Sequence, residues 1–206
     1  MDRRTFLLAS GAALLPLGGR ARPLFARELA DPPLPPVTLS WDTVEERKAW
    51  SAELLAAAAL HKAELDRGNP DLFIPGYLQL TPEQQLKFWA ELVIGVAKFE
   101  SSWKPHVIFH EPPPLGIDSV GLLQLSYEDQ SAYGLEPLSR SQKSLENPLV
   151  NLRCGVKIMA RLVARDAVVA RGKGKQSRGA ARYWSVLREG HHVEEIRART
   201  KLQLGL

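Results

Sequence analysis

Apolar residues recur at helical spacing along most of this chain. Residues 43–67 are rich in Ala, Leu and Glu, and the Gly-Asn-Pro that follows them ends the predicted helix. A second helix is predicted over residues 81–102. Thr81 caps it, Pro82 suits its first turn, and Gln84 completes a capping box.

Downstream of this helix, a proline-rich and glycine-rich stretch at 105–120 predicts a loop. Four further helices are expected at residues 126–133, 147–170, 177–188 and 191–203. No segment of useful length alternates apolar and polar residues as a strand does, and no internal repeat is found. The pattern therefore predicts a mainly α fold.

The first 26 residues have the composition of an export signal. Two arginines, Arg3 and Arg4, precede Phe6 and a short apolar run, which resembles a bacterial twin-arginine signal peptide. A frayed N-terminal helix of a cytosolic protein is the weaker alternative. We therefore expect a protein of the periplasm or cell envelope.

The remaining chain divides by composition. Residues 27–42 are proline-rich and predict a linker, residues 43–80 predict an N-terminal helical extension, and residues 81–206 predict the main domain. The single cysteine, Cys154, lies in an apolar helical run, so it forms no internal disulfide and is expected in the core.

Charge is distributed unevenly. The net charge is −8 over residues 27–152 and +9 over residues 153–206. A basic C-terminal part suits an anionic partner such as nucleic acid, a membrane surface or an acidic wall polymer. Solvated helix faces and basic loops are the alternative explanation for most of these charges. Because recognition motifs and interleaved aromatic residues are missing from the basic loop, we expect no nucleic-acid partner.

One carboxylate lies on an apolar stripe. Trp89, Val93, Val96, Glu100 and Trp103 follow one another at steps of four, three, four and three residues. Burial favours the protonated form of a carboxyl group, and a protonated carboxyl can donate a proton to a glycosidic oxygen. Periodicity alone also fits a structural glutamate at the rim of the core.

Four motifs in order change that balance. Glu100-Ser101 is followed by Gly121-Leu122-Leu123-Gln124, by Asn147-Pro148-x-x-Asn151-x-x-x-Gly155, and by Ala181-x-Tyr183. In order and spacing this set resembles the lytic transglycosylase SLT domain of the lysozyme-like superfamily, over residues 83–190. The resemblance implies a helical, goose-type or SLT-like lysozyme fold, here with an extra N-terminal helix.

The resemblance also assigns roles. It implies that Glu100 is the sole catalytic acid and base, that residues 121–124 line the sugar cleft beside Ser101, and that Tyr183 lies near Glu100. Tyr183 would then donate a hydrogen bond to the Glu100 carboxylate or stack against a sugar. Trp184 is expected to offer a stacking face. The residues expected to serve as scaffold are Asn147, Asn151 and Gly155.

The reaction implied is cleavage of the MurNAc–GlcNAc β-1,4 bond of peptidoglycan with a 1,6-anhydro product. The alternative is a hydrolytic muramidase on the same fold, with Asp118 as a second carboxylate. Goose-type lysozymes have an aspartate at the position of Ser126, which favours the non-hydrolytic route here. A non-catalytic peptidoglycan-binding module is the alternative from another class.

No cofactor or metal is expected. His106, His110 and Glu111 cluster in a proline-interrupted loop, and His191 and His192 are adjacent, but neither group matches a metal-ligand spacing. We expect these histidines to be solvent-exposed. Association with the wall or a membrane surface remains an expectation from the basic C-terminal part.

Overall fold

The computed structural model describes residues 37–113 and 116–206. The predicted signal peptide and most of the predicted linker lie outside the described residues. The helices are α1 (Arg47–Leu60), α2 (Lys62–Asp66), α3 (Pro70–Phe73), α4 (Pro82–Ser101), α5 (Asp129–Tyr133), α6 (Pro148–Asp166) and α7 (Val193–Leu204). Between them lie the 3-10 turns η1 (Tyr77–Gln79), η2 (Ser144–Glu146), η3 (Gly174–Gln176), η4 (Ala180–Arg182) and η5 (Ser185–Leu187).

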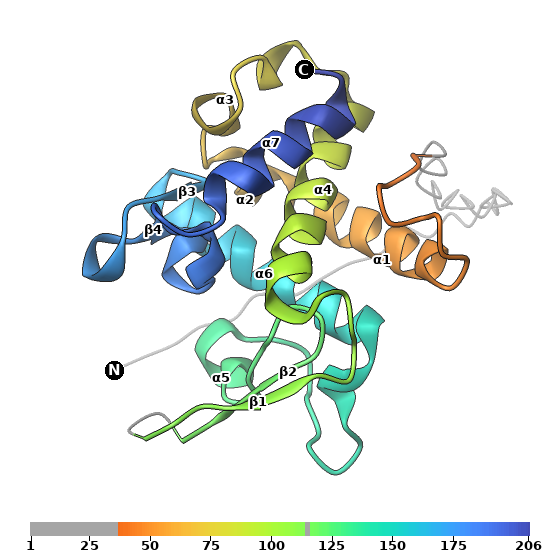
Figure 1. The fold of residues 1–206 in the computed structure, drawn as a ribbon, viewed down its shortest axis with the longest axis vertical. Coiled ribbons are helices and arrows are strands. Elements are labelled where there is room, and N and C mark those ends of the chain that lie inside the picture. Colours follow the sequence, from red (N-terminus) through yellow and green to blue (C-terminus); the bar gives the residue numbers. More distant parts are fainter. Residues whose placement is uncertain (1–36, 114–115) are drawn as a thin grey trace, which may run out of the picture. The chain divides into compact units, whose positions relative to one another are not determined.

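Helix α4 is at the centre of the fold (Figure 1). Both α1 and α7 pack against it, and α6 packs against α1 and α2. Every residue of α4 from Phe88 to Ala97 is buried, as expected of a helix that neighbours cover on all sides. The start of α4 is as predicted: Thr81 Oγ1 accepts from the Gln84 amide, and Gln84 Oε1 accepts from the Thr81 amide at 2.9 Å.

The mainly helical fold is confirmed, and it also contains two pairs of short strands that the sequence pattern did not indicate. Strands β1 (Ile108–His110) and β2 (Asp118–Val120) form an antiparallel hairpin, and β3 (Ala170–Arg171) pairs with β4 (Arg178–Gly179). Strands of two or three residues are too short to show an alternating pattern in the sequence.

Two predicted helices also differ. The predicted helix over residues 43–67 is interrupted at His61, which separates α1 from α2. The predicted helix over residues 177–188 is wrong: this segment contains β4, η4 and η5 instead. Gly179 explains the difference, because its φ of 59° is left-handed and breaks a right-handed helix.

Within the described part of the chain, no helix combines the length and apolar character that a membrane span requires.

Candidate active site

Glu100 lies in the last turn of α4, and its side chain is only partly exposed at the edge of the buried stripe. The pKa of Glu100 is raised to about 7, mainly by the loss of water around its carboxyl group and also by the charge of Glu111. The charge of Arg188 acts in the opposite direction. At neutral pH the protonated and ionised forms of Glu100 are therefore both populated. A carboxyl group with such a pKa can donate a proton and later accept one.

The backbone turns sharply directly after Glu100. Ser102 and Trp103 both adopt left-handed conformations, with φ of 52° and 62°. Such conformations are uncommon for residues other than glycine and cost about 1–3 kcal/mol each. The Trp103 indole is fixed by its Nε1, which donates to the Ile94 carbonyl at 3.0 Å. This turn leads the chain into the β1–β2 hairpin, which Figure 1 shows beside the end of α4.

The hairpin places a second carboxylate near Glu100. Phe109 pairs with Ser119 in its register, and Glu111, two residues after Phe109, lies on the same face. Ser119 Oγ donates to Glu111 Oε1 at 3.0 Å, and the Glu111 amide donates to the Ile117 carbonyl at 2.9 Å. These contacts fix the carboxylate whose charge Glu100 senses.

Sequence reasoning missed Glu111 as a carboxylate of the site. The residue stood out only within a histidine cluster, and in residues 37–113 and 116–206 no group of three or more His, Cys, Asp or Glu is placed to hold a metal ion. The proline-rich sequence around Glu111 gives too weak a signal to predict the hairpin, or to predict which residues lie on each of its two faces.

Asp118, the second carboxylate expected from sequence, lies on the other face of the hairpin. It pairs with His110 in the register, and His110 Nδ1 lies 2.6 Å from Asp118 Oδ1. Arg140 Nη1 lies 3.6 Å from Asp118 Oδ2. Asp118 is thus held by two cationic or potentially cationic groups, on the opposite face from Glu111.

Residues 121–124 form the wall behind Glu100. Leu122 and Leu123 are fully buried. Ser101 is also buried, and its Oγ donates to the Leu122 carbonyl at 2.9 Å. These three side chains therefore support the site from within the core and present no surface to a sugar.

Gly121 is needed for a different contact from the one expected. Its φ is 80°, and a Cβ at this position would lie 2.4 Å from Asn151 Nδ2 and 2.4 Å from the Leu145 carbonyl oxygen. The close approach is therefore to Asn151 and the backbone of η2. These contacts do not support the expectation that Gly121 lines the sugar cleft.

Asn151 connects the wall to α6. Its Nδ2 donates to the carbonyls of Val120 and Leu145 at 2.9 Å each, and its Oδ1 accepts from the Leu123 amide at 2.9 Å. A Cβ on Gly155 would lie 2.2 Å from Leu123 Cδ1. The polar motif of α6 therefore positions residues 121–124 from behind.

Gln124 is the member of this segment that remains partly exposed. Its Nε2 donates to the carbonyls of Gly121 at 2.8 Å and Val107 at 3.1 Å. Both amide hydrogens are thus used within the protein. Oε1 is left as an acceptor for a ligand donor such as a sugar hydroxyl or an N-acetyl N–H.

Tyr183 and Trp184 are placed differently from the expectation. The Tyr183 hydroxyl donates to Asp129, not to Glu100, and burial raises the pKa of this hydroxyl. Trp184 is 1% exposed, and its Nε1 donates to the Leu123 carbonyl at 2.9 Å. The expected stacking of Trp184 on a sugar is therefore wrong, because the core covers both faces of the indole.

The chain matches a family model and several solved structures. The family model described as transglycosylase SLT domain matches residues 79–168. The solved structure "Bd0314 DslA wild-type form 2" is 35% identical, with a TM-score of 0.69 over 80% of this chain and 95% of that chain. No match was found among curated proteins.

Two more solved structures are glutamate-to-glutamine mutants of Bd0314 DslA. They are 35% and 32% identical to this chain, with TM-scores of 0.66 and 0.64. They cover 78% and 80% of this chain, and 92% and 95% of their own. The two mutated glutamates stand 11 positions apart in that protein.

Proposed function

This chain belongs to the transglycosylase SLT domain family, and from that premise we propose that it is a peptidoglycan lytic transglycosylase with Glu100 as acid and base. The observation that carries the assignment is the environment of Glu100. It is the carboxyl group at the end of the buried α4 stripe, and its pKa is raised to about 7. A protonated carboxyl at neutral pH is what cleavage of a glycosidic bond requires.

The proposed reaction needs one carboxylate in two roles. Glu100 gives its proton to the oxygen between MurNAc and GlcNAc while the bond from that oxygen to C1 breaks. The N-acetyl carbonyl of MurNAc stabilises the positive charge that develops at C1. The Glu100 carboxylate then removes the proton of the C6 hydroxyl, O6 bonds to C1, and the 1,6-anhydro ring closes without water.

Other groups of the site support Glu100 in these steps. Arg188 favours the ionised form of Glu100 that exists after the first proton transfer, whereas burial and Glu111 favour the protonated form before it. Gln124 Oε1 accepts a hydrogen bond from the sugar beside the reacting bond. Phe109 is 54% exposed on the hairpin face of Glu111, where its ring offers a surface for a sugar.

Glu111 favours hydrolysis as the second candidate. Two carboxylates are the usual equipment of hydrolytic glycosidases, one as acid and the other to activate water or act as nucleophile. Glu100 and Glu111 stand 11 positions apart, the same separation as the two glutamates mutated in the related solved structures. This agreement with the related protein favours Glu111, rather than Asp118, as the second carboxylate of a hydrolytic reaction.

The products distinguish the two reactions. Purified peptidoglycan is digested with the native protein, and the masses of the released muropeptides are measured. A transglycosylase gives anhydromuropeptides, whereas hydrolysis gives products about 18 Da heavier. Heavier products from the native protein would replace the first proposal by the second. An active Glu100→Gln protein would contradict both reactions, because both need the Glu100 carboxyl group. A native protein that releases no muropeptides would leave the binding module.

Export through the twin-arginine route is part of the same proposal, because the polymer lies outside the cytoplasm. Arg3 and Arg4 are the paired arginines that this export route recognises. We expect the native protein in the periplasmic fraction of a Gram-negative host, and a protein with both arginines changed to lysine in the cytoplasm. Equal periplasmic amounts of the two would contradict the twin-arginine route.

A further inference from the structure

Positive charge is concentrated in one segment beside the site. Residues 161–188, here named the cationic segment, contain eight arginines and lysines and a single acidic residue. The segment runs from the last turns of α6 through β3, η3, β4 and η4 to the residue after η5. Its charge contrasts with the net −8 of residues 27–152.

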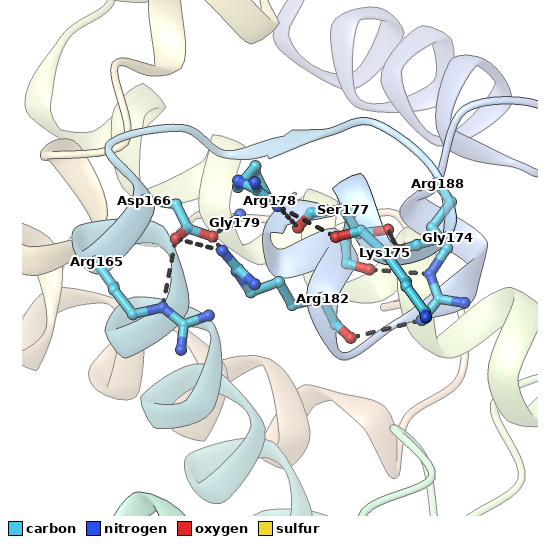
Figure 2. A network of polar contacts seen from close by, with 10 residues as sticks. Arg165, Asp166, Gly174, Lys175, Ser177, Arg178, Gly179, Arg182 and Arg188 are labelled. Carbon is cyan, nitrogen blue, oxygen red and sulfur yellow. Dashed lines mark hydrogen bonds and ion pairs between the residues drawn. The ribbon is translucent and has the colours of Figure 1, made fainter.

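The single acid is already occupied. Asp166 forms an ion pair with Arg182, lies 3.4 Å from Arg165 Nε, and accepts from the Gly179 amide at 2.7 Å. Figure 2 shows Asp166 between these partners. Its carboxylate therefore holds β4 to the end of α6 and leaves the other cations of the segment without an acidic partner from within it.

Three of those cations are exposed and unpaired in the described structure. Arg171, Lys173 and Lys175 are exposed. Their side chains form no ion pair or hydrogen bond with any residue that the structure describes. Their charges are therefore available to a partner in solution.

The loop that carries them is held in shape from within. Ser177 Oγ donates to the Gly174 carbonyl at 2.8 Å, and Arg178 Nη1 donates to the Ser177 carbonyl at 2.9 Å, as Figure 2 shows. On the far side, Glu189 Oε1 accepts from the Gly172 amide at 2.9 Å. A preorganised loop loses less conformational entropy when it binds a ligand.

The cationic segment borders the candidate active site. Its residue Arg188 is close enough to Glu100 for its charge to lower the pKa of that carboxyl group. Tyr183, also in the segment, is bonded to Asp129 of α5. The Gly172–Glu189 hydrogen bond holds the loop next to Arg188, so a polymer strand that extends from Glu100 on this side reaches it.

We propose that Arg171, Lys173 and Lys175 form a binding site for the carboxylates of peptide stems on the glycan strand that occupies the cleft. This proposal rests on the proposed function. The glycan of such a strand is largely uncharged apart from these stems, and the stems repeat along it. Several exposed ion pairs, each weak alone, add up on a polymer that presents many carboxylates.

The test compares two triple variants with the same loss of charge. In one, Arg171, Lys173 and Lys175 become glutamine. In the control, Arg67, Arg199 and Lys201 become glutamine; their side chains also have no hydrogen bond or ion pair to a described residue, and they lie outside the segment. Both triples are made in a Glu100→Gln background, so that the substrate stays intact, and thermal unfolding checks that both fold.

Binding is measured by co-sedimentation with intact sacculi and with glycan strands from which an amidase has removed the stems. We expect the loop triple to bind intact sacculi about tenfold more weakly, and the control triple to stay within about twofold of its parent. On stripped strands the two triples bind equally, and added salt weakens the parent on intact sacculi alone.

Three results would each overturn the proposal. Both triples could bind intact sacculi equally weakly, the loop triple could lose as much binding on stripped strands as on intact sacculi, or the loop triple could lose no binding at all. The parent could also bind phosphatidylglycerol vesicles or duplex DNA more tightly than sacculi. If the loop triple abolished that binding, the segment would be assigned to a lipid surface or to nucleic acid instead. Failure of the proposed function is a separate result: native protein would release no muropeptides, whatever the binding difference between the triples.

Discussion

At the scale of single residues, the candidate site contains two glutamates that come from different elements. Glu100 ends a buried helix, and Glu111 lies on one face of a short hairpin. The charge of Glu111 makes Glu100 harder to ionise, since a nearby like charge favours the protonated form. The coupling is therefore measurable in the pH dependence of the reaction.

The first prediction concerns Glu111→Gln. Removing its charge removes one cause of the raised pKa of Glu100, so the loss of kcat/KM at alkaline pH, centred near 7 in the native protein, moves to lower pH. At pH 7 we expect activity to fall roughly two- to fivefold if Glu111 acts only through its charge. The measurement is kcat/KM on solubilised glycan strands from pH 4 to pH 9.

Asp118→Asn is the matched control for this prediction, because Asp118 belongs to the same hairpin but faces His110 and Arg140. Its pH profile should coincide with that of the native protein. A loss of activity in Glu111→Gln at every pH, by about a hundredfold or more, would instead mean that Glu111 takes part in the chemistry.

The second prediction concerns stability. The Glu100 carboxyl ionises near 4.5 when the chain is unfolded and near 7 when it is folded. Between these pH values the folded state binds more protons, so stability falls as pH rises. Glu100→Gln removes this cost. The variant should therefore be more stable than the native protein at pH 8, by about 1–3 kcal/mol after allowance for partial solvation.

Near pH 4 the two proteins should unfold alike, since Glu100 is then protonated in both states. Denaturant unfolding at pH 4 and pH 8 measures the difference. Equal stabilities at pH 8 would show that the Glu100 carboxylate is well solvated, and the physical basis for calling it the proton donor would be lost.

At the scale of elements, the long helices were predictable and the short elements were not. The start of α4 follows from Thr81, Pro82 and Gln84, and the start of α6 from Asn147 and Pro148, because capping is a local property. The β1–β2 hairpin depends on pairing between residues eight to twelve positions apart, which no local capping signal reveals. The effect of the Glu111 charge on Glu100 depends on that hairpin and could not be found from spacing alone.

The motif residues show the same division. Sequence reasoning identified residues 121–124, Asn151 and Gly155 through a resemblance, but the pattern does not say which of them touch a ligand. The structure shows most of them in contact with one another behind Glu100. Burial depends on the tertiary structure. A sequence motif therefore does not distinguish residues that support the site from residues that contact the substrate.

The third prediction tests how these elements end. Ala167 caps α6 at φ 53° and ψ 34°, a left-handed conformation that suits glycine better than alanine. Ala167→Gly should stabilise the protein by about 0.5–1 kcal/mol, whereas Ala164→Gly, inside the same helix, should destabilise it by about 1 kcal/mol. Denaturant unfolding of the two variants compares them, and the same sign for both would contradict the assigned left-handed cap.

The fourth prediction concerns the wall behind Glu100. At Gly121, alanine would be strained at φ 80° and would place Cβ 2.4 Å from the Leu145 carbonyl oxygen, which belongs to the backbone and cannot rotate away. We expect Gly121→Ala to cost about 2–4 kcal/mol and to lower kcat more than it raises KM, because Gly121 itself packs against Asn151 and Leu145 and not against the substrate. A rise in KM alone would restore Gly121 as a ligand contact.

At the scale of the whole molecule, the question is how much of the chain the catalytic unit needs. The family model matches only residues 79–168, yet the core extends beyond them on both sides. Glu91 of α4 is 4% exposed and accepts from the Ser40 amide at 2.7 Å and from Ser40 Oγ at 2.6 Å. Helices α1 and α7 pack against α4, and buried Trp184 donates a hydrogen bond to the backbone of residues 121–124.

The last prediction follows from this arrangement. A fragment of residues 79–168 would leave the α4 faces that contact α1 and α7 in water, and it would leave the Glu91 carboxylate without the Ser40 donors. Exposing several large apolar side chains costs about 1.5–3 kcal/mol each, which exceeds the stability of an ordinary domain. We expect the fragment to bind a hydrophobic dye and to unfold without a cooperative transition, whereas residues 37–206 unfold in one. A cooperative transition in the fragment would mean that the N-terminal helices and residues 169–206 are accessory to the fold. Its absence would make them part of the fold that holds Glu100 in place.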